Sequence, residues 1–198
     1  MARLIAFKDL PAAPWKNGGG STTEIMAAPA GAGFDDFDWR VSLATIARSG
    51  AFSAFPGIDR SLALVGGGVV LELDGARVEL GAAAPPLRFA GETPVFATVE
   101  AASTDFNVMT RRGRCRHRLR RLALPASLAR RSGTTLLFLA DGEQAVAADG
   151  AAEFRLRRFD ALLLDGGDAV EWDIAAAPGT SIFVVDFFTD AAGAAVVN

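Results

Sequence analysis

The stretch SLALVGGGVVLELDGARVEL, residues 61–80, decides the fold class. Two short apolar runs, 61–65 and 69–73, flank a glycine triplet, which is typical of a β-hairpin. Asp74-Gly75 is a further tight-turn signal before residues 76–80. Short apolar runs separated by Gly, Pro and Asp continue along most of the 198 residues. This pattern predicts an all-β sandwich or barrel.

The same pattern recurs in the second half of the chain. Leu64 has a counterpart in Leu139, and Asp74-Gly75 has one in Asp149-Gly150, each 75 residues further along. Repetition of this kind predicts two β-barrels or jelly rolls side by side in one chain. Because Asp-Gly turns are common in any β protein, duplication stays a hypothesis at this point. We expect the halves to span residues 1–110 and 111–198, packed as one unit, and the first strands could be shared between them.

Two segments have distinctive local signals. Pro125–Arg131 favours a short helix, since it has a proline in its first turn and arginines in its last. Residues 180–189 are apolar on both alternating faces, which predicts a strand buried between sheets.

Composition excludes several classes of partner. A formal net charge of -3 gives no reason to expect nucleic acid or an anionic membrane. The sequence has no uninterrupted apolar run of about 18 residues, and residues 1–10 lack the pattern of a signal peptide. One cysteine, Cys115, cannot form an intramolecular disulfide and fits a reducing compartment. We therefore expect a cytoplasmic protein.

Residues 111–121 contain seven arginines, and those from 112 to 120 occupy alternate positions. A period of two without interleaved aromatic residues predicts a solvated strand face that pairs with aspartates, rather than a nucleic-acid surface. An anion site at Arg111 and Arg112 is the open alternative. The single histidine, His117, excludes a histidine-rich metal centre, and we predict no metal and no cofactor, although a carboxylate-only site is still conceivable. We expect His117 to be a structural strand residue.

Polar residues gather on one face of two predicted strands. Arg40, Ser42 and Ala44 alternate with apolar residues, as do Asp105, Asn107 and Met109. Both patterns suggest the wall of a polar pocket. The alternative is that Asp105 and Asn107 cap a turn or face solvent.

The stretch from Pro14 to Gly20 places Trp15, Lys16 and Asn17 directly before three glycines. Glycine backbone lets a ligand or a strand approach closely, which favours a recognition loop. A Walker phosphate loop does not fit, because the lysine precedes the glycines. A mobile glycine loop with an exposed lysine is the open alternative.

Four motifs, in order along nearly the whole chain, strongly resemble the HutD/Ves family: Pro14–Gly20, Trp39–Ser42, Phe52–Arg60 and Asp105–Arg111. The resemblance implies a cupin-type fold with two jelly-roll halves, a bicupin. It also implies binding of a metabolite of bacterial histidine utilisation, such as urocanate or a formylated glutamate derivative. The sequence lacks the paired histidines and the glutamate with which ordinary cupins hold a metal.

Transferring the family motifs gives a candidate ligand site whose residue types suit a small carboxylate. Its predicted residues are Trp15, Lys16, Asn17, Arg40, Ser42, Arg60, Asp105 and Asn107. In the opposing interpretation, Trp15, Phe52 and Phe55 fill the core and Arg60 pairs with Asp59 or Asp105.

The leading hypothesis is therefore a metal-free protein that binds a small anionic metabolite and has a regulatory role in histidine utilisation. The alternative is a metal-independent isomerase or hydrolase on a similar carboxylate, with Lys16, Glu24, Asp105 or His117 as acid or base. A purely structural or interaction protein is the third hypothesis. Whether the chain forms a homodimer stays open.

Overall fold

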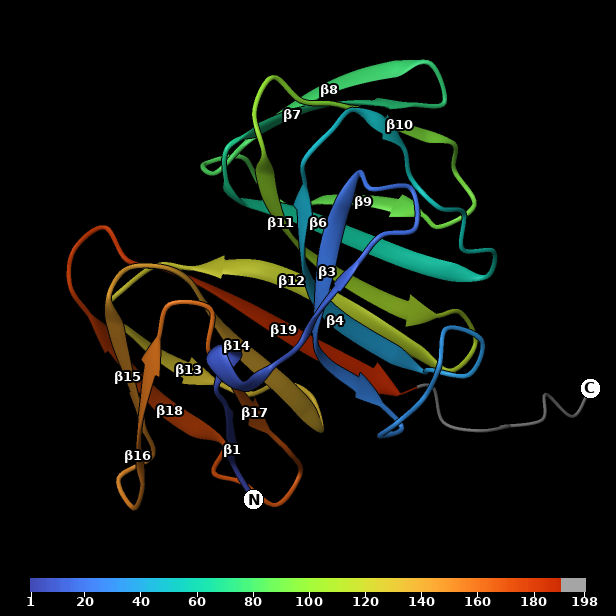
Figure 1. Cartoon of the computed structure of the whole chain (residues 1–198). Helices are drawn as coiled ribbons and strands as arrows, with labels where there is room; N and C mark the ends of the chain where they lie inside the picture. Colours follow the sequence, from blue (N-terminus) through green and yellow to red (C-terminus); the bar gives the residue numbers. More distant parts are fainter. Residues whose placement is uncertain (190–198) are drawn as a thin grey trace, which may run out of the picture.

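The computed structural model describes residues 1–189 and contains two β-barrels that lie against each other (Figure 1). In the N-terminal barrel, a six-stranded sheet has the order β2 (Ala12–Pro14), β3 (Gly20–Ala28), β4 (Trp39–Ile46), β11 (Ser103–Arg111), β6 (Ile58–Gly66), β9 (Leu87–Ala90). A four-stranded sheet has the order β5 (Gly50–Ala51), β10 (Val95–Thr98), β7 (Gly68–Leu73), β8 (Ala76–Gly81).

The C-terminal barrel repeats this arrangement. Its five-stranded sheet has the order β1 (Arg3–Ile5), β17 (Ala161–Leu164), β14 (Thr134–Asp141), β19 (Ser181–Thr189), β12 (Cys115–Leu122). Its four-stranded sheet has the order β13 (Ala126–Ala129), β18 (Glu171–Ala176), β15 (Gln144–Ala148), β16 (Glu153–Arg157). Each strand from β4 to β11 thus has an equivalent from β12 to β19 in the same place, and the duplication read from the sequence is a duplication of topology.

The first strand of the chain joins a sheet of the C-terminal barrel. β1 pairs with β17, so residues 3–5 belong to the C-terminal barrel although they precede the whole N-terminal one. The chain then enters the N-terminal barrel after a single turn of 3₁₀-helix, η1 (Phe7–Asp9). It leaves through the β11–β12 connection, where β11 ends at Arg111 and β12 begins at Cys115.

The helix predicted for Pro125–Arg131 is wrong. Residues 126–129 form the edge strand β13, which pairs with β18 in the register Ala126 to Ile174 and Leu128 to Trp172. Leu128 is buried and both of its neighbours are exposed, which is the period of two of a half-buried strand. Pairing with β18 therefore outweighs the local helix signals.

The strand predicted for residues 180–189 is confirmed as β19, which pairs on both sides, with β14 and with the edge strand β12. Its alternate residues Ile182 and Val184 pack inside the C-terminal barrel. Phe183, Val185 and Phe187 point the other way and pack against the N-terminal barrel.

The two large sheets pack face to face, and their contact is a shared apolar core. Phe106 of β11 stacks on Phe138 of β14 with ring centroids 4.3 Å apart, and Trp39 of β4 stacks on Phe187 at 4.2 Å. Residues on the opposite face of each large sheet point into the two barrels. Among the described residues, no helix has the length and apolar character needed to span a membrane.

Candidate functional site

The candidate site lies inside the N-terminal barrel, on the inward face of β4, β11 and β6. On β11, Met109 pairs with Arg40 on one side and with Arg60 on the other. Two residues along β11, Asn107 pairs with Ser42 and with Leu62 in the same way. Paired residues of antiparallel strands share a face. Since Leu62 belongs to the apolar core of this barrel, the polar members of both sets point inward as well.

Arg60 is the unusual residue of this interior. It is only 6% exposed, and its guanidinium group forms no hydrogen bond and no ion pair with any residue of the described range 1–189. The rings of Phe52, Phe55 and Phe89 lie 5.0–5.4 Å from its Cζ atom. Burial lowers the pKa of Arg60 to about 10, so the group is charged at neutral pH. A buried cation without a hydrogen-bond acceptor destabilises a fold unless other groups compensate its charge.

Arg40, in contrast, has partners at the outer end of the site. Its Nε atom donates to Glu24 Oε2 at 2.7 Å, and one of its terminal nitrogens donates to Ser42 Oγ at 3.3 Å. The ring of Phe34 lies 4.9 Å from the Arg40 Cζ atom. The Glu24 side chain is 46% exposed and Phe34 is 58% exposed, so this end of the cluster meets the solvent.

Asp105 and Asn107 lie beside the arginines on β11. Burial raises the pKa of Asp105 to about 7, against the opposing effect of the Arg60 charge. The Oδ1 atom of Asn107 is buried and accepts no hydrogen bond from the described part of the chain. The interior therefore presents an unpaired donor, Arg60 Nε, and an unpaired acceptor, Asn107 Oδ1, with a carboxyl group that can hold a proton near neutral pH.

The structure brings together Arg40, Ser42, Arg60, Asp105 and Asn107, and it places the other three predicted residues on the loop before β3. Trp15 donates from Nε1 to Thr22 Oγ1 at 2.8 Å, and its ring packs on the apolar core of the N-terminal barrel. Asn17 Oδ1 accepts the Gly19 backbone N–H at 2.9 Å, which shapes the glycine turn. Lys16 is exposed.

The opposing interpretation of these residues is correct in one part and wrong in another. Phe52 packs on the core as that interpretation held, and it also flanks Arg60. Arg60 forms no ion pair within 4 Å with Asp59 or Asp105, although the Asp105 charge acts to raise the pKa of Arg60. Asp59 accepts from Arg88 at 2.8 Å and from Arg112 at 3.1 Å.

Sequence reasoning missed two aromatic residues, Phe34 and Phe89. Phe89 reaches Arg60 because β9 pairs with β6 in the register Arg60 to Phe89. Phe34 comes from the loop between β3 and β4 and stacks on Phe55 at 5.8 Å. Neither carries a local signal, since both depend on long-range packing. The sequence indicates Glu24 only as a candidate acid or base, whereas the structure makes it the ion-pair partner of Arg40.

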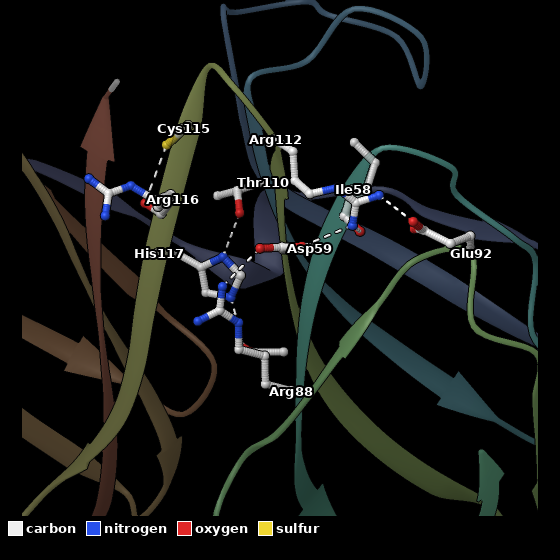
Figure 2. A network of polar contacts seen from close by, with 10 residues as sticks. Ile58, Asp59, Arg88, Glu92, Thr110, Arg112, Cys115, Arg116 and His117 are labelled. Atoms are coloured by element: carbon white, nitrogen blue, oxygen red, sulfur yellow. Dashed lines mark hydrogen bonds and ion pairs between the residues drawn. The ribbon is translucent and has the colours of Figure 1, made fainter. Parts of the chain in front are cut away.

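His117 is a structural residue that joins the two barrels (Figure 2). It projects from β12, and its Nδ1 atom lies 2.8 Å from Thr110 Oγ1 of β11. Its Nε2 atom lies 2.8 Å from Ser61 Oγ of β6. Burial lowers the pKa of His117 to about 4, so the ring is neutral in this setting. Because Ser61 is only 4% exposed, this Ser–His pair offers no accessible nucleophile.

The arginines at the start of the 111–121 run serve the fold rather than a free anion. Arg111 donates to the backbone oxygen of Phe37 at 2.9 Å. Arg112 bonds Asp59, Glu92 and the backbone oxygen of Ile58, as Figure 2 shows. Their donors are thus directed at acceptors of the chain itself.

The interior of the N-terminal barrel does not suit a divalent metal. It holds two guanidinium groups, which repel a cation, and one inward carboxyl group with a raised pKa. In residues 1–189 no group of three or more His, Cys, Asp and Glu side chains is placed to hold a metal ion.

Two hollows lie on the C-terminal barrel. One, of about 650 Å³, is lined by acidic and basic residues together: Asp141, Gly142, Glu143, Gln144, Arg157 and Arg158. The other, of about 330 Å³, is lined by Arg118, Arg120, Leu122, Ser127, Leu128, Ala129 and Arg131. The first balances its charges, and the second is dominated by arginine.

Comparison with known proteins identifies the relatives of this chain. The HutD family model matches residues 7–182. An uncharacterized 21.2 kDa protein from Pseudomonas putida, from the hutC 3' region, is 36% identical over 168 residues, which cover 84% of this chain and 88% of that protein. Protein Ves from Citrobacter koseri is 41% identical over 117 residues, 58% of this chain and 60% of that protein.

Solved structures agree with the barrel assignment. The structure of HutD from Pseudomonas fluorescens SBW25 (formate condition) superposes with a TM-score of 0.84 at 27% identity, covering 96% of this chain and 100% of that one. A cupin 2 conserved barrel domain protein from Leptotrichia buccalis superposes with a TM-score of 0.60 at 9% identity, covering 95% of this chain and 96% of that one. The second match shows the fold alone, and that fold is the cupin fold expected from the sequence.

Proposed function

The chain belongs to the HutD family, and we propose that it binds a small anionic metabolite, without a metal, inside its N-terminal barrel. The observation that carries this proposal is Arg60, a buried guanidinium group with no acceptor in the described part of the chain. A carboxylate would supply that acceptor with bidentate geometry. Family membership and the relative from the hutC 3' region support a regulatory role in histidine utilisation.

The remaining groups narrow the chemistry of the ligand. Asn107 Oδ1 needs a donor, so the ligand carries an N–H or O–H group in addition to its carboxylate. Arg40 is already neutralised by Glu24, which leaves the Arg60 charge, opposed in part by Asp105, and so at most about one positive charge for the ligand. Three rings surround Arg60 and favour a planar, partly apolar body. A monocarboxylate such as urocanate meets these conditions better than a formylated glutamate with two carboxylates.

The test is thermal unfolding and calorimetric titration of the wild type and Arg60→Met with urocanate, N-formylglutamate and acetate. A ligand at ten times its dissociation constant stabilises the fold by about 1.4 kcal/mol, which raises the midpoint by a few degrees. We expect this response to urocanate in the wild type and its loss in the variant. Without ligand, the variant should be as stable as the wild type or up to about 3 kcal/mol more stable, because it no longer buries an unpaired charge.

Arg77→Gln is the matched control, since Arg77 lies on β8 of the same barrel and is exposed. It should bind urocanate as the wild type does. If Arg60→Met keeps the wild-type affinity, the site assignment fails. If Arg60→Met loses both affinity and stability, Arg60 is a structural residue and the proposal also fails.

A metal-independent enzyme acting on a similar carboxylate is the second candidate, and Asp105 is the observation in its favour. A carboxyl group with a pKa of about 7 beside an arginine is suited to general acid or base catalysis. In that case Asp105→Asn abolishes turnover of the bound carboxylate while binding is retained. Binding without any turnover in the wild type supports the binding protein instead.

A further inference from the structure

The arginine-lined hollow of the C-terminal barrel is the counterpart of the candidate site in the N-terminal barrel. Strand pairing makes the equivalence explicit. In the N-terminal barrel Arg40 pairs with Met109, which pairs with Arg60. In the C-terminal barrel Arg118 pairs with Asp186, which pairs with Thr135. Arg118 therefore occupies the duplicated position of Arg40, and Arg120, two residues along, occupies that of Ser42.

The two barrels differ in how this position is covered. In the N-terminal barrel β4 is flanked by β3, which supplies Glu24 as the partner of Arg40. Within residues 1–189 the C-terminal barrel has no strand equivalent to β3, so β12 is the edge of its sheet in this part of the chain. The facing strand β13 is also an edge. The hollow of about 330 Å³ lies at this open seam, and residues of both strands line it.

The charge at the seam is unbalanced. Among residues 1–189, neither Arg118 nor Arg131 forms an ion pair or a side-chain hydrogen bond. Arg120 Nε lies 3.8 Å from Asp186 Oδ2, and Asp186 is only 2% exposed and also accepts from Thr135 Oγ1 at 3.1 Å. Three arginines therefore line a hollow that also has Leu122 and Leu128 in its wall, and among residues 1–189 only Arg120 of the three has a carboxylate oxygen within 4 Å.

We propose that this seam is a second anion-binding site, for a small dianion: a phosphate group or a dicarboxylate. Arg118 and Arg120 come from β12 and Arg131 follows β13, and the paired N–H donors of arginine match the oxygen pairs of either group. Leu122 and Leu128 give the hollow an apolar wall for the uncharged part of the ligand. The site uses none of the residues of the N-terminal site, so the inference does not rest on the function proposed above.

The experiment is calorimetric titration of the full chain at low ionic strength with inorganic phosphate and, separately, with malonate. We expect one or both dianions to bind. Arg118→Gln and Arg131→Gln should each weaken binding about tenfold, because each removes one charge-assisted contact. Both side chains are exposed, so neither variant should disturb folding. Binding of phosphate alone assigns the site to phosphate groups, and binding of malonate alone assigns it to dicarboxylates.

Two control variants make the result specific. Arg155→Gln removes an exposed arginine from β16 of the same barrel, outside the hollow, and should change the affinity less than twofold. Arg60→Met should likewise leave dianion binding unchanged, whatever it does to urocanate. The proposal is overturned if the wild type binds neither dianion at millimolar concentration, or if Arg155→Gln weakens binding as much as Arg118→Gln does.

Discussion

Two buried groups, Asp105 and His117, should make the stability of the fold depend on pH in opposite directions. The pKa of Asp105 is raised by burial from 3.8 to about 7, so the folded state favours its protonated form. Its stabilising effect is complete below pH 3.8 and is lost as the pH rises to about 7. The pKa of His117 is lowered by burial from 6.5 to about 4, so its effect is present above 6.5 and is lost as the pH falls.

The magnitudes follow from the two differences. Each group changes the free energy of unfolding by about 1.4 kcal/mol per pH unit inside its own window. Over the whole interval from 3.8 to about 7, Asp105 contributes about 4 kcal/mol. Between about pH 5 and pH 6.5 the two slopes cancel, so the wild type should be nearly insensitive to pH there. Other acidic groups with shifted pKa values, such as Asp59, have lowered values and act at more acidic pH.

Removing one of the two groups should reveal the pH dependence of stability that the other group causes. In Asp105→Asn the free energy of unfolding should rise by about 2 kcal/mol from pH 5 to pH 6.5, because only His117 still titrates. In His117→Gln it should fall by about the same amount over that range. Chemical denaturation of the three proteins at four pH values in this window measures the slopes. If both variants are as flat as the wild type, or if both slopes have the same sign, the reasoning about burial is refuted.

Two further substitutions test the fold. Gly20→Ala should destabilise the protein by about 3 kcal/mol, since a Cβ there would lie 2.0 Å from the Thr45 backbone oxygen. The control is Gly50→Ala, whose Cβ would meet nothing within 4 Å and which should be tolerated. Thermal unfolding compares the two variants. Phe138→Ala should lower the free energy of unfolding by about 3–5 kcal/mol, because its fully buried ring stacks on Phe106 across the two barrels. Denaturant unfolding measures this loss, and Phe96→Ala, at an exposed ring, is the control. A loss below about 1 kcal/mol would mean that the barrels do not depend on this contact.

The sequence predicted the fold class and the duplication because both are written in short-range patterns. Hairpin turns at Asp74-Gly75 and Asp149-Gly150 recur with the strand spacing, and they fall between paired strands in the structure. The sequence could not show that β1 joins the C-terminal barrel, because the strand signal of Arg3–Ile5 is the same whichever sheet it joins. The helix signals of Pro125–Arg131 misled for the same reason: the edge strand is fixed by its partner β18.

For the candidate site, too, the local pattern could be predicted from the sequence and the long-range contacts could not. Alternation on β4 and β11 placed Arg40, Ser42, Asp105 and Asn107 on one face, and strand pairing then aligns these faces. The lack of an acceptor for Arg60 could not be foreseen, because Asp59, its neighbour in the chain, points to the opposite face and binds Arg88 and Arg112. Which charges remain unpaired depends on three-dimensional packing, and this is the property on which both proposed sites rest.

The distribution of apolar packing explains how one barrel can hold a buried unpaired cation. The interior of the C-terminal barrel is filled by Leu137, Leu139, Trp172 and other apolar residues, and the core between the large sheets is mainly apolar, with His117 and its partners as a buried polar group. The N-terminal barrel therefore borders a well-packed sheet on one side, and it also has an apolar core of its own that includes Leu62, Leu64 and Leu71. Stability located in the shared core leaves its inward face free for polar groups, as expected of a binding site. Substitutions in the shared core should consequently affect both barrels, whereas substitutions at Arg60 and Arg118 should each affect one site alone.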